Sequence, residues 1–186
     1  MRIIGGSFKG KKINYTKSFN TRPLKDSVKE NIFNTLDHSN LINVRIINSN
    51  ILDLYSGVGS FGIECLSRGA NKVTFIEKDM KAFNILKENL IKLSIINKSK
   101  IINSKIEDDI LLNLNEKFNL FFFDPPFAEK NFIKNIELIK DNKLFEKNNL
   151  IIIHREKKTI DNFENLINVI NVKEYGRSKI IFGIFI

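Results

Sequence analysis

Two short stretches of this sequence combine residue types that could do chemistry. The first runs from Asp53 to Gly62 and contains glycines at Gly57, Gly59 and Gly62, with Glu77 twenty residues after Gly57. Such glycines let the backbone approach a nucleotide closely, and an acid at this spacing accepts hydrogen bonds from ribose hydroxyls. A ligand-free turn between a strand and a helix is the alternative, but it does not account for the spaced acid. The stretch therefore predicts a nucleotide-containing cofactor.

The glycine stretch by itself leaves two kinds of cofactor open. Dinucleotide enzymes bind a pyrophosphate through bare N–H groups at a helix start. Asp53 lies in the approach to the loop, where a cation would be favoured and a phosphate would not. S-adenosylmethionine, a sulfonium compound with a free amino group, suits this electrostatics better. The loop favours S-adenosylmethionine over a dinucleotide.

The second stretch is Asp124-Pro125-Pro126-Phe127, directly after the apolar run Leu120–Phe123. In an open α/β sheet it would lie at the carboxyl end of the fourth strand, beside the first strand, where ligands bind. Two successive prolines stiffen the backbone and free the Pro125 carbonyl from any helix or ladder. Asp124 and this carbonyl can therefore accept the two hydrogens of one planar exocyclic amine, while Phe127 offers a face on which the base can stack.

Methylation of an exocyclic amine needs these groups. The lone pair of the amine is delocalised into the ring, so the nitrogen is a poor nucleophile. Two acceptors favour a pyramidal nitrogen and stabilise the positive charge that develops on it. Since the methyl donor carries its own leaving group, in-line positioning is most of the remaining work. We expect no metal and no covalent nucleophile. A rigid loop with Asp124 as a helix cap is the structural alternative, and the neighbouring glycine stretch argues against it.

The pattern of apolar residues predicts the elements that position both stretches. Strands are expected at residues 51–55, 72–76, 100–103, 120–123 and 150–153, with helices after the glycine loop, after residue 79, and near 108–114, 130–140 and 160–168. Near-continuous apolar strands that alternate with helices predict a parallel sheet covered on both faces. Residues 169–174 and 179–186 flank a Tyr-Gly-Arg-Ser turn and predict an antiparallel hairpin. We expect a doubly wound α/β domain whose C-terminal edge is this hairpin.

The first 40 residues predict a small β-hairpin and a helix. Arg2–Ile4 and Lys11–Asn14 flank three glycines. Thr21 and Pro23 are typical of a helix start. The apolar stripe of the helix is Val28, Ile32, Phe33 and Leu36.

The charge of the chain is concentrated near its start. The sequence has 30 Lys and Arg against 21 Asp and Glu, net +9, and residues 1–30 alone hold eight basic and two acidic side chains. This is the sign expected of a protein that binds polyanions. A solvated surface position explains any single lysine, but the cluster favours contacts to an RNA backbone. The candidates for these contacts are Arg2, Lys9, Lys11, Lys12, Arg22, Lys25 and Lys29.

Several classes of protein are excluded by composition. No run of 18 apolar residues is present, so no membrane span is expected. The start of the sequence lacks the apolar stretch of a signal peptide. A single cysteine, Cys65, excludes a disulfide framework and a cysteine-rich metal site. We expect a cytoplasmic protein, and a monomer, without a metal.

Beyond these arguments, the sequence resembles the bacterial 16S ribosomal RNA guanine-N2 methyltransferase family. The Asp-Pro-Pro-Phe stretch resembles the amine-methylating motif of S-adenosylmethionine-dependent methyltransferases, whose variants serve adenine N6, guanine N2 and glutamine amides. The narrower resemblance lies in residues 2–6, 10–12, 21–23, 26–34, 52–57 and 64–70, which read RIIGG, GKK, TRP, DSVKENIFN, LDLYSG and ECLSRGA. It runs nearly from end to end.

This resemblance implies a Rossmann-like methyltransferase fold with a mostly parallel seven-stranded sheet. The implied substrate is the N2 amine of guanine 966 in 16S ribosomal RNA, within the 30S subunit or its assembly intermediate. The implied catalytic residues are Asp124, Pro125 and Phe127. The implied contacts to S-adenosylmethionine are Asp53, Tyr55, Ser56, Gly57, Gly59, Glu77, Lys78 and Ile106. Related enzymes often have Asp or Asn near the adenine, where this chain reads Ser104-Lys105-Ile106.

One domain over residues 1–186 is expected. Residues 1–40 would form a basic extension that contacts RNA and caps the active site, and residues 50–186 would form the catalytic core. Two other functions are open. An adenine-N6 methyltransferase of DNA or RNA would share the sheet and the Asp124–Phe127 stretch, but it usually carries an added recognition region. A ribosome-assembly protein without catalysis would not need the intact glycine loop. A nicotinamide dehydrogenase would leave Asp124–Phe127 unexplained.

Overall fold

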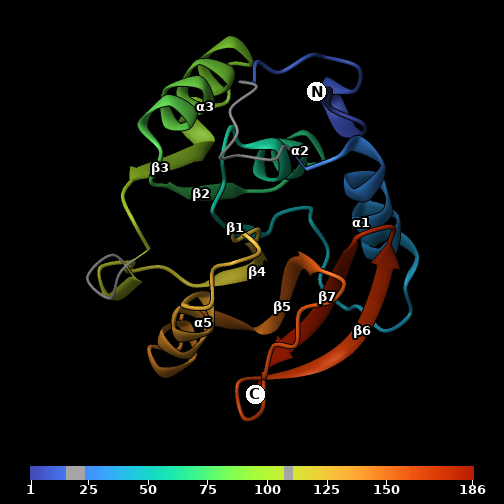
Figure 1. Ribbon diagram of the computed structural model, residues 1–186. Helices are drawn as coiled ribbons and strands as arrows, with labels where there is room; N and C mark the ends of the chain where they lie inside the picture. Colours follow the sequence, from blue (N-terminus) through green and yellow to red (C-terminus); the bar gives the residue numbers. More distant parts are fainter. Residues whose placement is uncertain (16–23, 107–110) are drawn as a thin grey trace.

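A seven-stranded sheet lies at the centre of the protein, whose computed structural model describes residues 1–15, 24–106 and 111–186 (Figure 1). The strands are β1 (Asn50–Leu54), β2 (Lys72–Glu77), β3 (Ser99–Asn103), β4 (Phe118–Phe123), β5 (Phe145–Glu156), β6 (Ile167–Tyr175) and β7 (Ser178–Phe185). The helices are α1 (Asp26–His38), α2 (Ser60–Ser67), α3 (Met80–Lys92) and α5 (Phe132–Asp141), with short 3-10 turns η1 (Gly6–Phe8) and η2 (Ile96–Lys98).

The strand order reverses between β1 and β4, so the carboxyl ends of these two parallel strands lie side by side. The order is β3-β2-β1-β4-β5-β7-β6, parallel from β3 to β5 and antiparallel for β7 and β6. In the register of β1 and β4, Leu54 pairs with Phe123, so Tyr55 and Asp124 leave the sheet together. This is the position where open α/β sheets bind ligands. The predicted doubly wound sheet with an antiparallel C-terminal hairpin is confirmed.

Helices cover both faces of the sheet, and alternate residues of each strand face opposite ways. Ile51 and Phe122 pack in one apolar cluster with residues of α1, α2 and α3. Leu52 and Phe123 pack in a second cluster with residues of α5. Figure 1 shows α2 and α3 on one side of β1 and β4 and α5 on the other. Burial on both faces explains why these strands are nearly continuous apolar runs.

Helix α1 packs through the apolar stripe that the sequence predicts. Val28, Ile32, Phe33 and Leu36 are all buried. The helix begins at Asp26. The predicted helix start at residues 21–23 lies outside the described residues.

The predicted N-terminal hairpin is smaller than expected. A single antiparallel bridge joins Arg2 to Lys12, supported by the Ile3 N–H, which donates to the Lys11 carbonyl at 3.0 Å. The glycine-rich segment between them winds into η1 instead of extending the ladder.

A predicted helix at residues 160–168 is wrong. The segment is irregular with a turn at 164–166, and β6 begins at Ile167. Asp161 is held by a buried ion pair with Arg155, and Phe163 packs against Phe132 with ring centroids 6.3 Å apart. Tertiary contacts therefore override the helical spacing of the apolar residues.

Two further predictions are modified. The strand β3 is only half-buried along its length, as befits the edge of the sheet, and was expected to be buried. The expected helix at 108–114 falls partly outside the described residues, and 111–112 are helical. No helix of the described residues is long and apolar enough to cross a membrane.

Candidate active site

The glycine loop leaves β1 along a left-handed backbone path. Tyr55, Gly57 and Gly59 have φ of 60°, 56° and 84°. A Cβ added to Gly59 would lie 2.4 Å from Cδ1 of Leu86, whereas one added to Gly57 would meet nothing within 4 Å. The left-handed φ of Gly59 favours glycine at this position, and a Cβ there would also require Leu86 of α3 to shift. Gly57 instead borders open space at the carboxyl ends of the strands, where a ligand has room.

Glu77 fastens this loop to the end of β2. Its Oε2 accepts a hydrogen bond from the Gly57 N–H and its Oε1 accepts one from the Asp79 N–H, both at 2.7 Å. The side chain is buried, and each carboxylate oxygen keeps a further lone pair. Glu77 thus has a structural role in addition to the ribose contact that the sequence predicts.

Asp53 provides a buried acceptor behind the loop. Its Oδ2 accepts a hydrogen bond from the Gly62 N–H at 2.9 Å, and its Oδ1 is buried with no partner among the described residues. Burial raises the pKa of Asp53 well above its usual range; the Gly62 N–H lowers it, and the Asp124 and Glu77 charges raise it further. An unpartnered buried carboxylate oxygen favours a cationic donor. The residues present therefore fit the ammonium group of S-adenosylmethionine.

The Asp-Pro-Pro-Phe stretch begins beside this loop. The Asp124 N–H donates to the Leu54 carbonyl at 3.4 Å, which continues the pairing of β4 with β1. Oδ1 of Asp124 lies 2.8 Å from Nδ1 of His154. Within the described part of the chain, no hydrogen bond to the Pro125 carbonyl is found. Asp124 and Pro125 can thus both present acceptor oxygens at the strand ends, as the sequence predicts.

Arg155 on β5 contacts Pro126, the third residue of the Asp-Pro-Pro-Phe stretch. The guanidinium is buried and forms a bidentate pair with Asp161, at 3.0 and 3.1 Å. It also donates to the Pro126 carbonyl at 3.3 Å and lies 4.5 Å from the centroid of the Phe132 ring. The two prolines are thus anchored to β5 as well as being stiff in themselves.

Tyr55 follows β1 and is fixed by a contact with α5. Its hydroxyl accepts a hydrogen bond from Nδ2 of Asn135 in α5 at 3.0 Å. Burial raises the pKa of Tyr55 to about 12, with the Glu129 charge as the next contribution. The ring is therefore a neutral, fixed wall at the predicted cofactor position.

Comparison with known proteins assigns the chain to a family. The model of the family described as Conserved hypothetical protein 95 matches residues 1–184. The chain belongs to this family.

Two relatives and one solved structure are similar to this chain over most of its length. Ribosomal RNA small subunit methyltransferase D of Buchnera aphidicola subsp. Baizongia pistaciae is 34% identical over 185 residues, which is 100% of this chain and 91% of the relative. The protein of the same name from Escherichia coli strain K12 is 33% identical over 156 residues, 84% and 75% of the two chains. The solved structure of yhhF from Escherichia coli, named as a methyltransferase, has a TM-score of 0.81 at 29% identity and covers 98% of this chain and 96% of that chain. The predicted family and fold are confirmed.

The other predicted cofactor contacts lie around the same strand ends. Ser56 is buried, and its hydroxyl donates to the Ile76 carbonyl at 3.3 Å. Lys78 is exposed directly after β2, and Ile106 is half-buried after β3. The Asn103 amide at the end of β3 donates to the Glu77 carbonyl at the end of β2, at 2.9 Å. Their contacts with the cofactor stay predictions.

One basic candidate for RNA binding is wrong. Lys29 is fully buried, with Nζ 3.7 Å from Glu64 and from Asp26, and it donates to the Arg2 carbonyl at 2.7 Å. Burial lowers the pKa of Lys29, while the Glu64 and Asp26 charges oppose the shift. Lys29 therefore serves an internal ion pair, because a buried charge must be paired, and it is not available to RNA.

The remaining candidates fall into two groups. Five of them have exposed side chains: Arg2, Lys9, Lys11, Lys12 and Lys25. Arg22 lies outside the described residues. The exposed group stays a predicted RNA-contacting surface.

The N-terminal segment is tied to the glycine loop as well as to α2. Glu64 accepts hydrogen bonds from the N–H groups of Ile4 and Gly5, at 2.8 and 2.7 Å. Asn89 in α3 donates to the carbonyls of Asn14 and Val58, at 3.0 and 3.2 Å, the latter inside the glycine loop. Residues 1–15 are thus packed against α2 and against the helix that holds the glycine loop.

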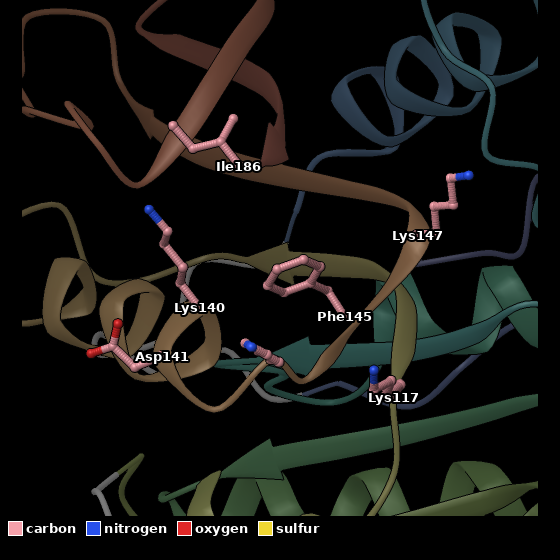
Figure 2. A pocket seen from close by; sticks show the side chains of 7 residues that line it. Lys117, Lys140, Asp141, Phe145, Lys147 and Ile186 are labelled. Carbon is pink, nitrogen blue, oxygen red and sulfur yellow. The ribbon is translucent and has the colours of Figure 1, made fainter.

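A basic groove lies at the opposite edge of the sheet, away from these residues. Figure 2 shows it around the Phe145 ring at the start of β5, near Ile186, which follows β7. Its lining residues are Lys117, Lys140, Asp141, Lys143, Phe145, Lys147 and Ile186. Since the amino ends of the parallel strands meet here, the groove is separate from the candidate active site.

Sequence reasoning places His154 and Arg155 at the ligand edge after the fifth strand and favours a structural role for His154, but it does not reveal that both residues contact the Asp-Pro-Pro-Phe stretch. His154 and Arg155 follow Ile153, which pairs with Phe123, the last residue before Asp124. Their place at the carboxyl end of a parallel strand was the available signal. Among the described residues, no group of three or more His, Cys, Asp or Glu side chains could hold a metal ion.

Proposed function

We propose that this protein transfers a methyl group to the exocyclic N2 amine of a guanine in 16S ribosomal RNA, at position 966. S-adenosylmethionine is the methyl donor, and it supplies a methyl group on a sulfonium sulfur that leaves as a neutral thioether. The relatives named as small subunit ribosomal RNA methyltransferases support the substrate class. The observation that carries the proposal is the placement of Asp124 beside the glycine loop.

One side of the crevice binds the cofactor, and the other side binds the target base. Asp53 and the Gly57 backbone bind and orient the cofactor. Asp124 Oδ2 and the Pro125 carbonyl accept the two hydrogens of the amine and turn its lone pair away from the ring. Phe127, half-exposed next to them, stacks on the guanine. Base stacking of this kind contributes about 1–3 kcal/mol, which offsets the cost of unstacking the target from its neighbours.

The basic extension supplies the electrostatic part of RNA binding. We propose that residues 1–40 contact the RNA backbone through their exposed side chains and cover the crevice, while residues 50–186 form the catalytic core. Such contacts position the RNA without reading its sequence. The proposed substrate is the 30S subunit or its assembly intermediate, and the proposed active form is the monomer.

Methyl transfer to ribosomal particles tests this function. The protein is incubated with methyl-labelled S-adenosylmethionine and 30S subunits that lack the modification, and the labelled nucleoside is identified after digestion. We expect N2-methylguanosine at one site. Asp124→Ala should lower kcat by about 100-fold or more, since it removes an acceptor for the reacting amine. Asp141→Ala, an exposed acid at the end of α5, is the matched control and should leave kcat unchanged.

Other products would contradict the proposal in different ways. N6-methyladenosine would indicate an adenine-N6 methyltransferase. No transfer to RNA or particle, with cofactor binding intact, would contradict methylation of this substrate and favour an assembly protein without chemistry.

A further inference from the structure

His154 makes a direct contact with the proposed catalytic acid that the mechanism above does not use. It lies on β5 one residue beyond Ile153, the partner of Phe123. Its Nδ1 is 2.8 Å from Oδ1 of Asp124, and both side chains are largely buried, with 12% and 21% exposed. Its ring also packs edge-on with Phe127, with centroids 5.8 Å apart and planes at 80°. One imidazole thus touches both residues that would hold the substrate base.

The surroundings of the ring decide where its proton lies. Nδ1 faces a carboxylate oxygen, which accepts hydrogen bonds and repels a lone pair, so the proton is on Nδ1. Nε2 is buried and has no hydrogen-bond partner among the described residues. The imidazole is therefore a fixed donor to Asp124.

We propose that His154 is a positioning residue that fixes the Asp124 carboxylate as an acceptor for the substrate amine. This inference rests on the proposed function. The terminal torsion of an aspartate is broad, so an unheld carboxylate would sample many orientations. With Oδ1 engaged by His154, Oδ2 is the oxygen presented with the Pro125 carbonyl to the two amine hydrogens. The same ring sets the position of Phe127.

The held Asp124 carboxylate stabilises the amine most strongly when the amine becomes cationic. As the nitrogen forms its bond to the methyl group, the methyl–sulfur bond breaks and its electron pair stays on sulfur. The nitrogen then releases one of its two hydrogens as a proton, for which Asp124 Oδ2 is the nearest proposed acceptor. A held carboxylate aims its charge at the nitrogen before the reaction begins, so no reorganisation is needed as the charge develops.

Two substitutions separate positioning from packing. His154→Asn keeps an N–H donor near the position of Nδ1, because the asparagine amide nitrogen is equally distant from the backbone, while His154→Ala removes it. Glu146→Ala, an exposed residue at the other end of β5, is the control. Each variant is assayed on 30S subunits for kcat and for the KM of S-adenosylmethionine, and its thermal unfolding midpoint is measured.

The expected result is a loss of kcat alone. His154→Ala should lower kcat by about 10- to 100-fold with the cofactor KM within about twofold, as for an interaction that serves the transition state. His154→Asn should recover most of this loss, and Glu146→Ala should match the wild type. An unchanged kcat in His154→Ala would overturn the proposal. Equal losses in the Ala and Asn variants, with both folded, would overturn it too.

The tautomer offers a test that does not depend on activity. Nitrogen-15 NMR of the imidazole should show a proton on Nδ1 in the wild type, protected from exchange, and loss of this protection in Asp124→Ala. A wild-type imidazole with its proton on Nε2 alone would overturn the proposal even if His154→Ala fails to fold. Methylation of another amine by the wild type would contradict the proposed function, whereas the ratio of variant to wild-type kcat on that amine would still test His154.

Discussion

The two sides of the candidate active site are held in place by different kinds of contact. On the cofactor side, Glu77 accepts hydrogen bonds from the backbone N–H groups of Gly57 and Asp79. On the base side, His154 and Arg155 reach from β5 to the Asp-Pro-Pro-Phe stretch. Glu77 reaches from β2 to the loop after β1, and its partners are backbone N–H groups. On the base side the donors are side chains of β5, so substitution of His154 or Arg155 removes a contact to the stretch directly. The two sides should therefore respond to different substitutions.

The largest expected effect comes from Arg155. Arg155→Met leaves Asp161 buried without its partner, and breaking a buried ion pair in this way costs about 3–5 kcal/mol. Combining it with Asp161→Leu should restore most of the free energy of unfolding, since neither charge is then left unpaired. The double variant should still have a low kcat, because the Pro126 carbonyl has lost its donor from β5.

Chemical denaturation and steady-state kinetics measure these two quantities separately. The KM for S-adenosylmethionine should be unchanged in the double variant, since the glycine loop is held from β2. A double variant with wild-type kcat would show that Arg155 stabilises the fold without serving the catalytic loop.

A smaller effect, on the other side, is expected from Glu77→Gln. An amide has one acceptor oxygen where the carboxylate has two, so one of the N–H groups of Gly57 and Asp79 loses its partner. An unsatisfied buried N–H costs about 1–3 kcal/mol. Because this cost falls on the cofactor loop, the affinity for S-adenosylmethionine should drop by about 10-fold or more while kcat at saturation changes little.

Calorimetric titration with the cofactor checks this expectation, with Glu137→Gln at an exposed position of α5 as the control. A fall in kcat without a fall in affinity would show that the two sides are not separable in the way their contacts indicate.

Much of this site could be predicted from sequence because it depends on local rules. The glycine spacing fixes a strand-to-helix turn, and the carboxyl ends of parallel strands must meet at one edge, so Asp53, Glu77 and Asp124 could be placed together. His154 and Arg155 lie at the same edge, but their partners are 30 and 6 residues away along the chain. Residue type alone does not reveal such pairs.

Lys29 shows the same limit for charge. It has the sequence features of an exposed basic side chain, and its neighbour one turn earlier, Lys25, is exposed. Its burial depends on Glu64, which also accepts the backbone N–H groups of Ile4 and Gly5. A charge count predicts a basic extension, whereas only the packed structure tells which of its lysines are used internally.

Asp53 lies between the two sides and gives the smallest expected change in stability. Burial raises its pKa, and the charges of Asp124 and Glu77 raise it further. An acid whose pKa is higher in the folded protein binds its proton more tightly there than in the unfolded chain. The folded protein therefore loses stability as the pH rises above the unfolded value of about 4. Asp53→Asn carries no charge and escapes this loss, so the variant should gain stability relative to the wild type from acidic to neutral pH.

Thermal unfolding of both proteins across this pH range measures the difference, which should become independent of pH below the unfolded pKa. A pH-independent difference would contradict the assignment of the shift to Asp53. S-adenosylhomocysteine, which keeps the ammonium group, should reverse the order at neutral pH: it should stabilise the wild type more than the variant, because the charged carboxylate then has a cationic partner. The carboxylate is thus costly in the empty crevice and useful in the filled one, which is the behaviour expected of a group retained for binding.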